Sequence, residues 1–309
     1  MERHDIIIVG AGPAGMAAAV YASRAAWDVL MLEQQMPGGK LLLTSEVENY
    51  PGTGLLSGPD LADEMYRHAT MFGAVHAWGD VRKIERSPEE GANSLLVHCA
   101  DRSLEARAVI VASGTKERKL GIPGEEEYYG MGVSYCAVCD GAFFRDRETL
   151  VIGGGSTAFE DALYLTRFAS KVTVAMRRDV SRAEVLTQQR VRDNPKIDVR
   201  HWWVPLEILG ENGRVSAVRF KNVKTDEVFV HQTAVVFPLI GVLPNTDFVA
   251  AEILDGERYI VTDERMRTGV PGLFAAGDVR AKRLRQIVTA TSDGAIAAEE
   301  AGHYLDMLG

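Results

Sequence analysis

The feature that most constrains the fold is a glycine-rich motif, G-x-G-x-x-G, at residues 10–15. It follows the apolar, strand-like run Asp5 to Val9 and precedes a helix-like segment, 16–26. In this context the glycines allow a tight turn and a close approach of backbone to a pyrophosphate, and the helix start offers free amides. Glu33 ends the next strand-like run, 23 residues after Gly10, where its carboxylate can accept hydrogen bonds from a ribose. The start of the chain therefore predicts a dinucleotide-binding unit.

The same fingerprint occurs again in the middle of the chain. The strand-like run 149–152 leads into Gly153–Ala158, with the pattern G-x-G-x-x-A, and a helix-like segment follows. The position equivalent to Glu33 is Met176, so no carboxylate is present there to repel a phosphate. Three arginines follow instead, namely Arg177, Arg178 and Arg182. We expect the first site to bind an adenine dinucleotide without a 2′-phosphate and the second to bind NADPH.

Two of the three cysteines, Cys136 and Cys139, form a Cys-X-X-Cys motif between the fingerprints. This spacing lets the sulfurs cycle between dithiol and disulfide with little backbone movement. Asp140 places a carboxylate beside the second sulfur, where it can exchange a proton with the thiol; a turn or helix cap is the alternative role. Half of a zinc site is disfavoured, because the remaining cysteine, Cys99, is single and lies in an apolar run. Three catalytic residues and no metal are predicted: Cys136, Cys139 and Asp140.

The composition argues against several classes of function. The 309 residues are 46% hydrophobic and 25% charged, which is typical of a globular protein with two cores. The net charge of -9 is unfavourable for binding a phosphate backbone, so no nucleic acid partner is expected. We find no secretory leader pattern and no apolar run of the roughly 18 residues that a membrane helix needs, so we expect a cytoplasmic protein with no membrane partner.

Turn and strand signals indicate how the chain is divided. A charged linker with two glycines, 116–124, follows the first nucleotide unit, and a meander over 197–237 follows the second. Near the end, the buried run 272–279 contains Gly277-Asp278, which places a carboxylate at the edge where α/β sheets bind ligands. We predict an α/β fold with two Rossmann-like nucleotide-binding domains of the three-layer ββα type, the second inserted into a discontinuous first. The expected domain ranges are 1–115, 116–245 and 246–309.

Together these motifs resemble those of the low-molecular-weight, bacterial-type thioredoxin reductases, and the resemblance covers nearly the whole chain. The matching segments are 10–15, 38–39, 46–52, 136–140, 153–158, Arg177-Arg178 with Arg182, 277–279 and Arg285-Gln286. The resemblance implies an FAD domain formed by 1–115 and 246–309, an NADPH domain with the cysteine pair at 116–245, and a homodimer. The chain departs from the family pattern at Lys40, Leu42-Leu43, Ser156 and Met176. Because Met176 replaces a histidine that could donate a hydrogen bond, NADH is expected as a weaker or alternative donor.

The resemblance also implies two sets of cofactor-binding residues. Those expected to bind FAD are Gly10, Gly12, Pro13, Ala14, Gly15, Glu33, Gly39, Lys40, Leu41, Asn49, Val81, Gly277, Asp278, Arg285, Gln286 and Ile287. Those expected to bind NADPH are Gly153, Gly155, Ser156, Thr157, Arg177, Arg178, Arg182 and Gly241.

The predicted function is a relay from NADPH through FAD and the Cys136–Cys139 disulfide to thioredoxin or a thioredoxin-like protein. By the resemblance, Cys139 exchanges electrons with the flavin and Cys136 attacks the partner disulfide. Three alternatives share the architecture: an oxidase of a small dithiol, a flavin-loaded redox sensor without turnover, and a NADP-ferredoxin reductase. The cysteine pair argues against the last of these. Steady-state NADPH oxidation with and without a thioredoxin distinguishes an enzyme from a sensor.

Overall fold

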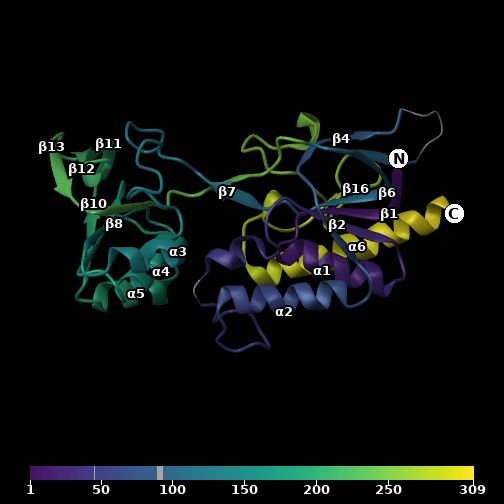
Figure 1. Cartoon of the computed structure of the whole chain (residues 1–309), viewed down its shortest axis with the longest axis horizontal. Helices are drawn as coiled ribbons and strands as arrows, with labels where there is room; N and C mark the ends of the chain where they lie inside the picture. Colours follow the sequence, from purple (N-terminus) through teal and green to yellow (C-terminus); the bar gives the residue numbers. More distant parts are fainter. Residues whose placement is uncertain (45, 89–92) are drawn as a thin grey trace. The chain divides into compact units, whose positions relative to one another are not determined.

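The computed structural model describes residues 1–44, 46–88 and 93–309, and the chain divides into two units. Unit 1 comprises Met1–Lys116 and Leu243–Gly309, and unit 2 comprises Glu117–Val242. In Figure 1, unit 1 is mainly purple, blue and yellow, and unit 2 is teal and green. Two short strands at the boundaries, β7 (Thr115–Glu117) and β15 (Val242–Pro244), pair with each other.

Unit 1 is built on a sheet with a parallel core. Its strands are β1 (Glu2–Val9), β2 (Val29–Glu33), β3 (Val75–Trp78), β4 (Val81–Arg86), β5 (Leu95–Cys99), β6 (Ser103–Val111) and β16 (Leu273–Ala275). The order is β3-β2-β1-β6-β5-β4, with β16 paired to β6. β1 is parallel to β2 and β6, whereas β5 is antiparallel to β4 and β6. The run Ile6 to Val9 in β1 is buried throughout, as expected for a strand covered on both faces.

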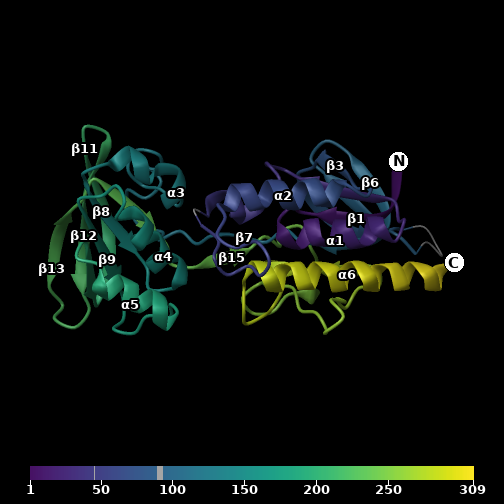
Figure 2. The ribbon, with the colours of Figure 1, turned by 90° about the horizontal axis from the view of Figure 1, so that it is seen from below.

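Helices cover one face of this sheet, and a second apolar core lies on the other, where the β4 and β5 end of the same sheet and the loops 248–260 contribute residues. The helices are α1 (Pro13–Arg24), α2 (Gly58–Thr70) and α6 (Ile287–Leu308), which lie side by side in Figure 2. Ile6 and Ile8 belong to the core formed with α1 and α6, and Ile7 and Val9 belong to the core on the opposite face, which includes residues of β4 and β5. Unit 1 therefore has three layers.

Unit 2 repeats this plan on a smaller scale. Its strands are β8 (Glu148–Ile152), β9 (Lys171–Met176), β10 (Ile197–His201), β11 (Trp203–Glu211), β12 (Arg214–Asn222), β13 (Val228–Gln232) and β14 (Val235–Pro238), and its helices are α3 (Ala137–Asp140), α4 (Ser156–Leu165) and α5 (Val185–Asp193). The parallel sheet has the order β10-β9-β8-β14, and the antiparallel sheet has the order β11-β12-β13. One face of the parallel sheet packs on α4, and the other packs on β11 and β12.

The predicted fold class is confirmed: both units are α/β layers around a parallel sheet with a glycine-rich turn after a strand. The prediction of one meander over 197–237 is wrong in part. Asn212 and Gly213 do form the turn between β11 and β12, with φ of 53° and 77°. However, β10 and β14 pair within the parallel sheet. β14 is buried along its whole length, whereas β13 alternates between exposed and partly buried residues, so the two belong to different layers.

Candidate active site

The Cys-X-X-Cys pair lies at the start of α3 in unit 2. Cys136 and Cys139 are joined by a disulfide. Cys136 caps the amino end of α3, and the backbone N–H of Cys139 donates to its sulfur at 3.0 Å. A hydrogen bond from an N–H favours the charged form of a sulfur, so it would stabilise a Cys136 thiolate once the disulfide is reduced. Of the two residues, Cys139 is exposed and Cys136 is partly buried.

The residues before the pair attach it to the core of unit 2. Ser134 donates its N–H to Val236 in β14, and its hydroxyl accepts the N–H of Cys136 at 3.1 Å. The hydroxyl of Tyr135 donates at 2.6 Å to the buried carboxylate of Glu125, which also accepts two backbone N–H groups. Burial, and then this hydrogen bond, raises the pKa of Tyr135, so the phenol remains a donor. Sequence patterns gave no signal for Glu125, because its partners come from loops.

Asp140 is the last residue of α3, one residue beyond Cys139. Its carboxylate makes no hydrogen bond with any residue in the described ranges, and the 3₁₀ turn that begins after it has no side-chain cap. The alternative role as a helix cap therefore has no hydrogen bond to support it. Phe143 follows three residues later, and its side chain is largely exposed, at 81%.

The first fingerprint connects β1 to α1. Gly10 has φ of 107°, and a Cβ there would lie 2.5 Å from the carbonyl oxygen of Ala112. A Cβ at Gly15 would lie 1.9 Å from the carbonyl oxygen of Gly10, so this glycine is required for the packing of helix on turn. Gly12 differs, because a Cβ there would meet nothing within 4 Å. Gly12 also precedes α1 without capping it by a side chain. Because Pro13 has no N–H, the N–H groups of Ala14 and Gly15 are the first in α1 that could donate to a ligand.

Glu33 lies beside this turn at the end of β2. Its Oε2 accepts the N–H of Ala11 at 2.9 Å, and its Oε1 accepts the N–H groups of the two following residues. The 3₁₀ turn Gly39–Leu43, which contains the predicted residues Lys40 and Leu41, also reaches the fingerprint. The N–H of Gly38 donates to the carbonyl of Ala11 at 2.8 Å. The structure therefore brings three predicted FAD segments together at the carboxyl ends of β1 and β2.

Asp278 follows β16 and has one buried oxygen, Oδ1, without a hydrogen-bond partner in the described part of the chain. Burial raises the pKa of this carboxyl, an effect opposed by the positive charge of Lys282. The preceding Gly277 packs on the fingerprint helix, because a Cβ there would lie 2.7 Å from the Cβ of Ala14. A buried oxygen that lacks a donor at the carboxyl end of a sheet is what a ligand hydroxyl or N–H would satisfy.

The remaining predicted FAD residues lie around the start of α6 and in β4. Asn49 donates from Nδ2 to Oε1 of Gln286 at 3.1 Å, although the two are 237 residues apart. The guanidinium of Arg285 lies 4.1 Å from the ring centre of Tyr259. The other two are Val81, at the start of β4, and Ile287, at the start of α6.

The second fingerprint connects β8 to α4. Gly155 precedes α4 without a side-chain cap, and a Cβ there would meet nothing within 4 Å, as at Gly12. α4 begins with the predicted residues Ser156 and Thr157. Met176 is buried at the end of β9, and its Cε would lie 2.9 Å from a Cβ at Gly154. Met176 therefore packs beneath the glycine turn.

The three predicted arginines lie next to this turn. The N–H of Arg182 donates to the carbonyl of Gly154 at 2.8 Å, which fixes the loop after β9 to the fingerprint. Arg177, Arg178 and Arg182 are exposed, and their guanidinium groups form no ion pair with a described residue. The carbonyl of Gly241, which has φ of 119°, accepts the N–H of Arg118 at 2.9 Å. In the described part of the chain, Gly241 forms no hydrogen bond with these three arginines.

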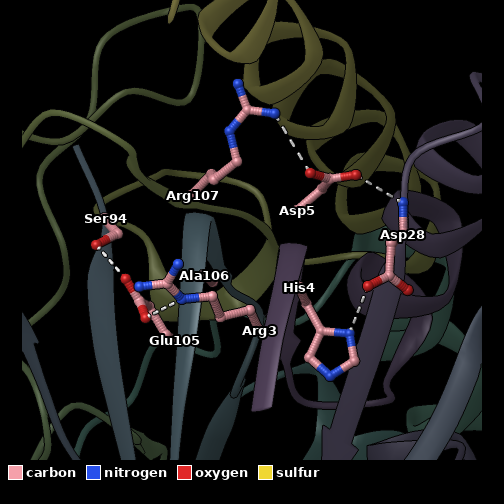
Figure 3. Close-up of a pocket in the computed structure, with 8 residues that line it drawn as sticks. All are labelled: Arg3, His4, Asp5, Asp28, Ser94, Glu105, Ala106 and Arg107. Atoms are coloured by element: carbon pink, nitrogen blue, oxygen red, sulfur yellow. Dashed lines mark hydrogen bonds and ion pairs between the residues drawn. The ribbon is translucent and has the colours of Figure 1, made fainter. Parts of the chain in front are cut away.

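A separate cavity of about 230 Å³ lies at the amino ends of β1 and β2 in unit 1 (Figure 3). Its charged side chains are paired with each other, as between His4 and Asp28 at 2.8 Å. The lining residues are Arg3, His4, Asp5, Asp28, Ser94, Glu105, Ala106 and Arg107. None is a predicted site residue. Within the described ranges, no cluster of His, Cys, Asp and Glu side chains could hold a metal ion, and no helix is long and apolar enough to cross a membrane.

Comparison with known proteins gives consistent matches over the full chain. Residues 4–294 match the family described as pyridine nucleotide-disulphide oxidoreductase. The thioredoxin reductase of Bacillus subtilis is 49% identical over 306 residues, covering 99% of this chain and 96% of that protein. The crystal structure of Lactococcus lactis thioredoxin reductase matches with a TM-score of 0.95 at 45% identity, covering 98% of this chain and 99% of that one. The thioredoxin reductase of T. acidophilum matches over the whole of both chains with a TM-score of 0.93 at 33% identity.

Proposed function

Because the chain belongs to the pyridine nucleotide-disulphide oxidoreductase family, and within it to the low-molecular-weight thioredoxin reductases, we propose that it reduces the disulfide of a thioredoxin-type protein. The protein is a flavoprotein disulfide reductase that uses FAD and NADPH. The observation that carries the proposal is the Cys136–Cys139 disulfide, which lies in the same unit as the second nucleotide fingerprint. The oxidase and sensor alternatives are not favoured by the relatives.

We assign FAD to unit 1, and three observations support a fit. Among the residues that the structure describes, none would meet a Cβ at Gly12, none caps the amino end of α1 with its side chain, and none donates to the buried Oδ1 of Asp278. A pyrophosphate needs the first two features, and a hydroxyl or N–H of the cofactor would satisfy the third. Bound FAD would supply the two-electron chemistry that links a nicotinamide to a disulfide.

We assign NADPH to unit 2, at the start of α4. The space at Gly155 would accept a pyrophosphate, as at Gly12. The exposed guanidinium groups of Arg177, Arg178 and Arg182 would contact a 2′-phosphate. Because Met176 is buried under the turn, it makes no polar contact with the ribose, and the discrimination against NADH would depend on the arginines.

The thiol chemistry follows from the arrangement of the pair. Reduction of the Cys136–Cys139 disulfide consumes one electron pair and two protons and gives two thiols. A Cys136 thiolate, stabilised by the N–H of Cys139, then attacks the partner disulfide, forms a mixed disulfide and releases one partner thiolate. Attack by Cys139 on the Cys136 sulfur releases the second partner thiolate and re-forms the internal disulfide. Asp140, with no hydrogen-bond partner in the described chain, would carry protons to and from Cys139.

The exposed surface supports a protein partner in place of a small dithiol. The side chain of Phe143, four residues after Cys139, is 81% exposed, and an exposed aromatic ring beside a redox pair suits docking of another protein. We further propose a homodimer in the cytoplasm. Large apolar side chains of unit 1 that are exposed in the single chain, such as Trp78 and Leu55, are compatible with a subunit interface. Analytical ultracentrifugation would give the oligomeric state.

The experiment that tests the proposed function is NADPH oxidation by the FAD-loaded protein with a panel of thioredoxins. We expect turnover that depends on thioredoxin concentration and a lower kcat/KM with NADH. The control is the double variant Cys136→Ser, Cys139→Ser, which should bind FAD and accept electrons from NADPH but reduce no thioredoxin. Thioredoxin-independent oxidation of a small dithiol would favour the oxidase, and binding of a partner without turnover would favour the sensor. Either outcome would contradict the proposal.

A further inference from the structure

A buried group of charged side chains lies beneath the Gly277–Asp278 turn of unit 1. We call Arg280, Lys282 and Asp293 the Asp293 cluster. Oδ2 of Asp293 accepts Nζ of Lys282 at 2.7 Å and pairs with Nη1 of Arg280 at 2.9 Å. All three side chains are about nine-tenths buried, with exposed fractions of 10% to 11%. Buried charges are stable only when they are paired and hydrogen-bonded, so these three depend on one another.

The cluster fixes the turn directly. The same oxygen of Asp293 accepts the backbone N–H of Gly277 at 3.0 Å. Gly277 has φ of 79° and packs on Ala14 of the first fingerprint. Gly294, next to Asp293 on α6, makes a second close approach, because a Cβ there would lie 2.1 Å from the carbonyl oxygen of Ala14. Asp293 therefore lies where α6, the turn and the start of α1 meet.

Asp278 follows Gly277 directly in the turn that the cluster holds. Its Oδ1 is buried and has no hydrogen-bond partner in the described part of the chain. Burial raises the pKa of the Asp278 carboxyl, and the positive charges of Lys282, Arg285 and Lys40 oppose this effect only in part. Arg280 is held elsewhere as well, since its Nε donates to the hydroxyl of Thr262 at 2.7 Å. Among the described residues, Asp293 is the one that pairs with the Lys282 ammonium.

From these contacts we propose that Asp293 and Lys282 are positioning residues for FAD. Asp293 holds the Gly277 amide, and Lys282 and Arg280 hold the Asp293 carboxylate, so the three side chains fix the turn that carries Asp278. The inference rests on the proposed assignment of FAD to unit 1. It predicts that the affinity of the apoprotein for FAD depends on two side chains that lie beneath the turn.

Fluorescence titration of the apoprotein with FAD tests this, with Asp293→Asn and Lys282→Met as the variants. We expect each to weaken FAD affinity by about tenfold or more, which corresponds to about 1.4 kcal/mol. Lys282→Arg keeps a cation and should stay within about threefold of the wild type. Because Asp293 and Lys282 act as a unit, the double variant should lose little more FAD affinity than the single variant with the larger loss.

The matched control is Glu300→Gln, also on α6. The side chain of Glu300 is 13% exposed and pairs with Arg267, so the change removes a buried carboxylate from the same helix without touching the Gly277 turn. We expect it to lower the melting temperature of the apoprotein but to leave FAD affinity within about threefold of the wild type.

The outcomes separate this inference from the proposed function. If the wild type binds FAD and both Asp293→Asn and Lys282→Met bind it as tightly as Glu300→Gln does, the positioning role is refuted and the proposed function is unaffected. If Asp293→Asn does not fold, the comparison of Lys282→Met with Lys282→Arg decides, and equal affinities there would refute the inference. A wild-type apoprotein that bound no FAD would refute the flavin assignment and the inference with it.

Discussion

Replacement of Asp161 by Asn should stabilise the protein at alkaline pH. Asp161 lies in α4, and the apolar side of this helix shares a core with Ala137 of α3. Its side chain is partly buried and makes no hydrogen bond with a described residue. Burial, and then the charge of Glu160, raises the pKa of Asp161 to about 7 from 3.8. One pKa unit corresponds to about 1.4 kcal/mol, so a rise of about 3 units corresponds to a difference of about 4 kcal/mol between the free energies of ionising Asp161 in the folded and the unfolded protein.

The sign follows from proton binding. Between pH 4 and pH 7 the folded protein keeps a proton on Asp161 that the unfolded chain releases, so stability falls as the pH rises through this window and stays low above it. Asp161→Asn removes this dependence. Its stability relative to the wild type should therefore increase by about 2 to 3 kcal/mol between pH 5 and pH 8.

The assay is urea-induced unfolding of the FAD-loaded protein, followed by circular dichroism at both pH values. The control is Asp193→Asn, which changes an exposed acid on the neighbouring helix α5. The stability of this control relative to the wild type should be the same at pH 5 and pH 8. An Asp161→Asn variant whose stability relative to the wild type is the same at both pH values would show that Asp161 is ionised in the folded protein, and the reasoning would be wrong.

Three further predictions concern the proposed sites. Gly12→Ala should leave the apoprotein folded but weaken FAD binding by tenfold or more. Gly15→Ala should destabilise the apoprotein itself, because its Cβ would lie 1.9 Å from a carbonyl oxygen. Melting curves and FAD titrations distinguish the two variants. Arg177→Ala with Arg178→Ala should lower kcat/KM for NADPH by about tenfold or more and change that for NADH little; equal losses would exclude a 2′-phosphate role. Asp140→Asn should slow thioredoxin reduction by roughly 10²-fold, and a wild-type rate would exclude proton transfer.

The two nucleotide units could be predicted from sequence because their signals are local. A buried strand, a glycine turn and a helix start lie within about 20 residues of each other in the fingerprint, and both fingerprints occur in this setting, at β1–α1 and β8–α4. Glu33 could be predicted as well, because it ends the next strand-like run, 23 residues after Gly10. The predicted meander over 197–237 did not separate β13 from β14. The sequence does change there, from the mixed polar and apolar residues of Val228–Gln232 to the continuous apolar run of Val235–Pro238.

The contacts that support the sites could not be predicted, because their partners are distant in the chain. Asp293 contacts Gly277 only through the packing of α6 on α1, and Glu125 binds Tyr135 through loops without a periodic pattern. The one local trace of the Asp293 cluster is an acid among the small residues of a helix. Burial of Met176 beneath Gly154 likewise depends on the shape of the turn and not on the residue type alone.

The central claim is that the Cys136–Cys139 disulfide exchanges electrons with bound flavin, and an anaerobic titration of the FAD-loaded protein with dithionite tests it most directly. We predict that the wild type takes up two electron pairs per chain, one on FAD and one on the disulfide. The double variant Cys136→Ser, Cys139→Ser should take up only one. Equal uptake by the two proteins would mean that the pair does not exchange electrons with the flavin, and the account would be contradicted.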